Sequence, residues 1–253
     1  MALFKSGNPA LSEKTFQDIS YTNVSSETMT VSGTLNKFGI LLTLLIASAV
    51  FSWGSFFNNS EYAQPFAIGG FIGAIIIYIT MMFKREWAGY LAPIYAVCEG
   101  LVIGAISAIY AFSFAKSMPN IVSNAIGLTL AIAAGMFLLY RFKIIRATEK
   151  FKAIIGSAVM GIAIYYIVLI VLGFFNVNVS FAYDASPLGI GIQIFIAAVA
   201  SLNLIRYFDL IEDGANYNAP KYMEWYCSFG LMVGLIWLYL EILDLLSRFA
   251  RRN

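Results

Sequence analysis

The sequence predicts an all-α, polytopic membrane protein with seven transmembrane helices. Three observations predict it: 60% of the 253 residues are hydrophobic, only 12% are charged, and long apolar runs without charge follow one another along the chain. A soluble domain carries about a quarter charged residues. The composition therefore indicates a protein of the lipid bilayer. The net charge of +2 is too small to indicate a nucleic-acid partner.

Seven segments are long enough to cross the hydrocarbon, because about 20 apolar residues in a helix span about 30 Å. Five of them contain no charged residue: Phe38 to Phe57, Pro65 to Phe83, Pro119 to Tyr140, Ala153 to Phe175 and Ala185 to Ile205. Trp87 to Ala115 contains Glu99, and Trp225 to Leu246 contains Glu241 and Asp244. We expect one helical domain over residues 37–253, preceded by a polar tail, residues 1–36.

The short loops predict the orientation, since Lys and Arg accumulate on the cytoplasmic side. Lys84 and Arg85 follow the second span, and five basic residues lie between the fourth and fifth spans. The loops of the other side carry Lys116 alone. We therefore expect a cytoplasmic amino terminus. Seven complete crossings would place the carboxyl terminus outside, so its arginines, Arg248, Arg251 and Arg252, run against this trend. Either the last segment does not cross fully or the earlier loops set the orientation, and we favour the second interpretation.

The chain contains no histidine, which removes Ser-His-Asp and Cys-His nucleophiles and histidine metal sites from consideration. Cys98 and Cys227 lie singly in apolar runs and are interpreted as reduced packing residues. We expect neither an enzyme nor a bound cofactor. Any proton chemistry must rest on carboxylates.

Glu99 is the first candidate, because a carboxylate near the bilayer centre costs on the order of 3 kcal/mol. It lies twelve residues beyond Trp87, which at about 1.5 Å per residue places it roughly 18 Å into the span. Such a residue can belong to an ion or proton path. The alternative is a protonated glutamate that joins two helices structurally.

Glu241 and Asp244 form the second candidate, with Arg248 as a supporting residue on the same helix face. Two acids beside a guanidinium can hold one proton or one cation. Because lipid cannot accept such a face, we expect other helices to surround it. The alternative is a helix end whose charges are solvated at the headgroups, which Asp244 and Arg248 fit well.

The third candidate lies at the end of the sixth span, where Arg206 precedes Asp209, Glu212 and Asp213. The three acids are spaced i, i+3 and i+4, so they share one helix face. Oxygen ligands of this kind suit calcium. Solvated surface is the alternative, above all for Glu212 and Asp213, and any metal ligand set stays unknown.

Four motifs together resemble the bacterial branch of the Bax inhibitor-one membrane proteins. They are Asn8-Pro9-Ala10-Leu11-Ser12, the run Ala92 to Ser107 with Glu99-Gly100, Tyr207-Phe208-Asp209-Leu210-Ile211-Glu212, and Trp237-Leu238-Tyr239-Leu240-Glu241-Ile242-Leu243. The likeness covers nearly the whole chain. It implies a seven-helix bundle with the last helix central in the bundle, set in the bacterial inner membrane, and a pH-dependent calcium leak.

The resemblance also implies that an acid of the sixth helix and one of the seventh share a proton, at positions matching Asp209 and Glu241. Depth along the helices favours a different pair, because Glu99 and Glu241 differ by only about 6 Å along the membrane normal. Our hypothesis is that Glu99 pairs with Glu241 while Asp209 lies at the inner mouth. The alternative function, reported for relatives, is an interaction protein that modulates a membrane protease or a stress response.

Overall fold

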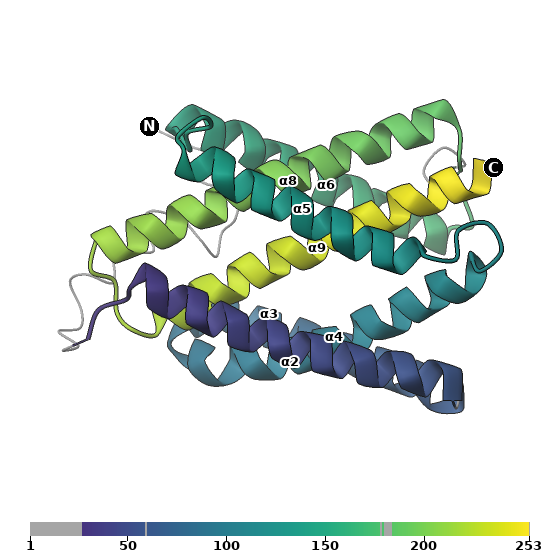
Figure 1. Cartoon of the computed structure of the whole chain (residues 1–253), viewed down its shortest axis with the longest axis horizontal. Coiled ribbons are helices and arrows are strands. Elements are labelled where there is room, and N and C mark those ends of the chain that lie inside the picture. The colour runs from purple at the N-terminus through teal and green to yellow at the C-terminus, as the bar shows by residue number, and fades with distance from the viewer. Residues whose placement is uncertain (1–26, 59, 178, 180–183, 253) are drawn as a thin grey trace. The chain divides into compact units, whose positions relative to one another are not determined.

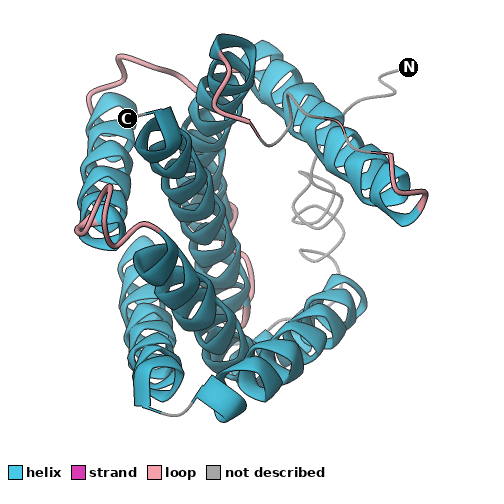
Figure 2. Cartoon of the chain, turned by 90° about the vertical axis from the view of Figure 1, so that its right-hand side faces the viewer, coloured by secondary structure: helices cyan, strands magenta, loops and turns pink. Residues whose placement is uncertain are grey.

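The computed structural model describes residues 27–58, 60–177, 179 and 184–252. These residues form seven α-helices and one short 3₁₀ helix, η1, and no strand. Figures 1 and 2 show the course of the helices. The helices are α2 (Val31–Asn58), α3 (Ser60–Phe83), η1 (Arg85–Trp87), α4 (Ala88–Ser113), α5 (Ile121–Arg141), α6 (Glu149–Phe174), α8 (Pro187–Asn216) and α9 (Met223–Arg252).

All seven α-helices are long and apolar enough to cross a membrane, so the predicted seven spans are confirmed. Two helix ends differ most from expectation. Helix α2 begins at Val31, inside the segment that we expected to be tail, because Thr30 caps it. Helix α8 continues to Asn216 and therefore carries the three clustered acids in its last turns.

More than half of the most apolar stretch of α8 and of α9 is buried, against less than a quarter for α2, α3, α5 and α6. These four helices expose large apolar side chains, as lipid-facing helices do. The burial of α9 agrees with the expectation that other helices surround it.

The chain divides into two compact units, and α8 and α9 each contribute to both. In the described chain, one unit contains residues 27–113 and Asp209–Val233. Its helices α2 and α4 approach closely, because Gly100 and Gly104 of α4 lie against the backbone carbonyls of Leu45 and Ala49 of α2. A side chain at either glycine would collide with that backbone, so small residues set this helix contact.

In the described chain, the other unit contains residues 114–177, 179, 184–208 and 234–252. Its core joins α6, α8 and α9: Ile162, Ile196 and Val199 are buried together, and Tyr166 and Trp237 pack against them. Helix α5 meets α8 through aromatic rings, since Phe137 and Tyr140 both contact Phe208. This core places the side chains around Glu241.

Candidate functional site

Glu241 lies inside the unit formed by α6, α8 and the second half of α9, and only 5% of the residue is exposed. The Tyr166 hydroxyl donates to both carboxylate oxygens, at 2.9 and 3.1 Å. Gln193 Nε2 donates to Oε2 at 2.7 Å, and also to the Glu241 carbonyl at 3.1 Å. Trp237 Nε1, one turn earlier on α9, donates to Oε1 at 2.7 Å. Three helices thus converge on one carboxylate.

The donors around Glu241 are all neutral. Within the part of the chain that the structure describes, no lysine or arginine lies within ion-pair distance of this carboxylate. Hydrogen bonds to neutral donors stabilise a buried charge and leave its negative sign uncompensated. A proton or a small cation is therefore the ligand that this site would attract.

Asp244 and Arg248 form a separate ion pair one turn further along α9. Arg248 Nε donates to Asp244 Oδ2 at 2.8 Å, and Nη1 donates to the backbone carbonyls of Asp184 and Gly189, each at 3.3 Å. Only 6% of Arg248 is exposed, so this charge is not simply solvated. The guanidinium joins the end of α9 to the start of α8 and neutralises Asp244.

Glu99 and Asp209 belong to the unit that contains α2, α3 and α4. Glu99 is half-buried on α4, with Tyr95 one turn earlier as its hydrogen-bonding partner. Asp209 is half-buried on α8, and Arg206 on that helix donates Nη1 to Asn203 Oδ1 at 3.0 Å. The pairing of Glu241 with Glu99 or with Asp209 stays a prediction.

The first turn of α9 holds a buried acid that the sequence reasoning missed. Glu224 is 0% exposed, and its carboxylate accepts hydrogen bonds from the backbone N–H and the hydroxyl of Thr30, at 2.9 and 3.0 Å. Lys37 of α2 forms an ion pair with it, and Lys221 Nζ lies 3.4 Å away. This carboxylate, unlike that of Glu241, is neutralised by cations.

Glu224 completes the amino-terminal cap of another helix. Thr30 caps α2 by accepting a hydrogen bond from the Gly33 N–H at 3.0 Å. In a capping box, the residue at this third helical position is a Glu or Gln whose side chain returns to the cap N–H. Here that position is glycine, and the carboxylate of Glu224 occupies the space where its side chain would begin. The capping box of α2 is therefore split between two helices.

Sequence signals existed for part of this arrangement. Thr30 three residues before a glycine indicates a cap that lacks its acidic partner, and Glu224 is an acid at the start of an apolar span. Nothing in the sequence connects two residues 194 positions apart. Tyr166 and Gln193 are likewise polar residues in apolar spans, and nothing in the sequence indicates that both donate to Glu241.

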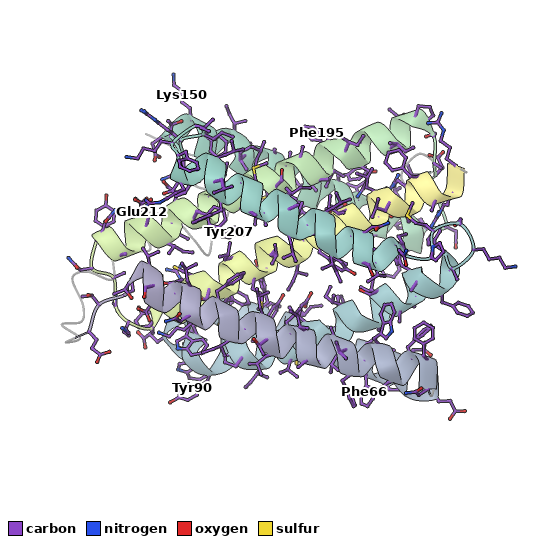
Figure 3. All side chains as sticks on the ribbon, viewed as in Figure 1. Phe66, Tyr90, Lys150, Phe195, Tyr207 and Glu212 are labelled. Atoms are coloured by element: carbon purple, nitrogen blue, oxygen red, sulfur yellow. The ribbon has the colours of Figure 1, made fainter. Side chains whose placement is uncertain are left out.

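Clusters of three or more Cys, Asp or Glu side chains that could hold a metal ion are absent from the described residues. The motif Asn8 to Ser12 and most of the polar tail lie outside those residues. The three acids of α8 are described, and Figure 3 shows Glu212 near the end of that helix. Asp209, Glu212 and Asp213 therefore form no such cluster in the described chain, which gives no support to the calcium ligands considered for this face.

The fold and the buried charges define a polytopic helical membrane protein with polar side chains in its interior. A family described as Bax inhibitor 1 like matches residues 8–251, nearly the whole chain. The chain belongs to the Bax inhibitor 1 like family, as the sequence motifs predicted. Searches among curated proteins and among solved structures found no match.

Proposed function

We propose that this protein is a pH-regulated passive cation leak, with calcium as the expected ion and Glu241 as the proton sensor. The observation that supports it is the Glu241 carboxylate, which is buried in a membrane span and whose donors, among the residues that the structure describes, are all neutral. The proposed activity is transport without catalysis. Its setting is the inner membrane of a bacterium, with the amino terminus in the cytoplasm.

Proton and cation compete for the same two oxygens in this proposal. When Glu241 is ionised, its charge attracts a cation, and the hydroxyl of Tyr166 and the amide of Gln193 can turn aside to admit it. Protonation removes that charge and converts one oxygen to a donor, so the existing donors can no longer all be accommodated. Flux should therefore fall as the pH falls.

The test is calcium flux across proteoliposomes as a function of pH, comparing the parent with Glu241→Gln. The glutamine keeps the size of the side chain and an accepting oxygen but cannot titrate, so we expect the pH dependence to flatten. Glu149→Gln, an exposed acid in the first turn of α6, is the matched control and should keep the parental profile. An unchanged pH profile in Glu241→Gln would falsify the assignment of the sensor.

The same assay separates the leak from a role in modulating a membrane protease or a stress response. Deleting residues 1–26 should leave a leak intact and should abolish an activity that depends on a partner of the tail. The deletion must stop there, because the Met29 N–H donates to the Ala219 carbonyl at 2.8 Å and Thr30 binds Glu224. A longer deletion would remove these contacts and confound the result.

A further inference from the structure

The connection between α5 and α6 concentrates positive charge at one end of two spans. Residues 141–152, here called the basic connection, contain one acid, Glu149, and five basic residues: Arg141, Lys143, Arg146, Lys150 and Lys152. All of these except Lys152 are exposed, and Figure 3 shows Lys150 projecting away from the start of α6. Among the described residues, the four exposed cations make no ion pair. Their charge is available to a ligand.

Hydrogen bonds fix both ends of the basic connection. At the end of α5, the Ile144 N–H donates to the Leu139 carbonyl at 3.0 Å and the Lys143 N–H donates to the Tyr140 carbonyl at 2.9 Å. This is the Schellman pattern of a helix end. At the start of α6, the Thr148 hydroxyl accepts from the Phe151 N–H at 3.3 Å. The basic side chains therefore project from a defined turn.

Lys143 occupies a position where glycine is the ordinary residue. Its φ of 56° lies in the left-handed region, which a Schellman helix end requires and which side chains disfavour. Backbone strain of this kind is found mostly at sites with a function. Lys143 carries a positive charge at this position, whereas glycine would carry none.

Two large apolar side chains alternate with these charges. Phe142 is 70% exposed and Ile144 is 68% exposed, although both lie within the same turn as Lys143. In water this exposure would be unfavourable, whereas at the edge of a bilayer apolar side chains enter the acyl region and basic groups meet the headgroups. The helix that ends here is itself a span.

We propose that the basic connection is a binding surface for anionic phospholipid headgroups, with Phe142 and Ile144 inserted beside the bound lipid. Exposed cations grouped at the end of a span attract anionic lipids. The exposed phenylalanine and isoleucine favour a lipid over a soluble phosphate, because only a lipid supplies an apolar environment next to the phosphate.

The test uses the full chain in vesicles that contain phosphatidylcholine and phosphatidylglycerol, each in a photoactivatable form in turn. Cross-links to residues 141–152 are quantified by mass spectrometry, and the ratio of glycerol to choline lipid is the readout. One basic residue near the surface changes lipid association by up to about fivefold. We expect the ratio to fall at least twofold in Lys143→Gln/Arg146→Gln/Lys150→Gln.

The control triple Lys84→Gln/Lys116→Gln/Arg252→Gln removes the same charge from exposed positions elsewhere and should keep the parental ratio. Lys143→Gly is the variant that separates lipid binding from stability: it relieves the strained backbone, so the protein should melt at a higher temperature while the lipid ratio falls. A parental ratio no higher than one, or equal ratios in the two triples, overturns the proposal. Loss of the cross-links in excess inorganic phosphate, but not in sodium chloride of the same ionic strength, also overturns it and assigns the surface to a soluble anion.

Discussion

Replacing Gly33 with alanine should destabilise the protein, and removing Glu224 should reverse the sign of that effect. A β-carbon at position 33 would overlap the carboxylate of Glu224. The carboxylate is the end of a flexible side chain, so it can move aside. It then loses its hydrogen bonds to Thr30 and its ion pair with Lys37.

The magnitude follows from those contacts. A hydrogen bond to a charged group contributes about 1.5–3 kcal/mol, and breaking a buried ion pair costs about 3–5 kcal/mol. Because Glu224 can keep Lys221 as a partner and Lys37 is partly exposed, we take about 3 kcal/mol for the combined loss. Alanine gains up to about 1 kcal/mol over glycine in a helix. The net effect of Gly33→Ala is a loss of about 2 kcal/mol.

In the Glu224→Ala background no carboxylate remains to be displaced, so Gly33→Ala should stabilise by up to about 1 kcal/mol. Gly39→Ala is the matched control on the same helix, because nothing lies within 4 Å of a β-carbon there. It should stabilise equally in both backgrounds. The coupling between positions 33 and 224 is then about 3 kcal/mol.

The assay is the free energy of unfolding in mixed detergent micelles for the four members of the double-mutant cycle. If Gly33→Ala changes stability by the same amount with and without Glu224, the carboxylate does not occupy that space and the split capping box is refuted. A loss for Gly39→Ala would instead indicate that alanine is unfavourable throughout α2, independently of Glu224.

Two further predictions concern the end of α9 and the start of α8. Arg248→Gln should lower the free energy of unfolding by about 2–3 kcal/mol, because it removes the guanidinium that donates to Asp244 and to two backbone carbonyls. Arg252→Gln changes an exposed residue and should have no measurable effect in the same micelles. Hydrogen bonds from Ser186 lower the pKa of the exposed Asp184 carboxyl. The ionised carboxyl therefore stabilises the folded state at pH values above the ordinary Asp pKa of about 3.9. This stabilisation disappears as the pH falls through the lowered pKa. Ser186→Ala should therefore reduce the loss of melting temperature between neutral and acidic pH; an unchanged acid profile would contradict this assignment.

The number of helices was predictable because a bilayer leaves a chain few choices. Each span must satisfy its own backbone hydrogen bonds, so an apolar run such as Ala153 to Phe175 is a helix whatever its neighbours are. Helix ends were harder, since Thr30 and Gly33 start α2 with the help of an acid from α9. The partners of Glu241 were not predictable, because a tyrosine or a glutamine in a span has no unique partner until the helices are packed.

The three acids of α9 differ in what neutralises them, and this difference supports the choice of Glu241 as the proton sensor. Glu224 forms ion pairs with lysines, and Asp244 forms one with Arg248. A proton or cation that binds either acid must therefore first displace a charged side chain of the protein itself. Among the described residues, the partners of the Glu241 carboxylate are the hydroxyl, indole and amide donors of Tyr166, Trp237 and Gln193. A ligand at Glu241 therefore replaces hydrogen bonds of neutral groups, which requires less energy than breaking a buried ion pair. Of the three, Glu241 is therefore the acid that we propose binds and releases a proton or cation, while Glu224 and Arg248 keep their contacts near the two ends of α9.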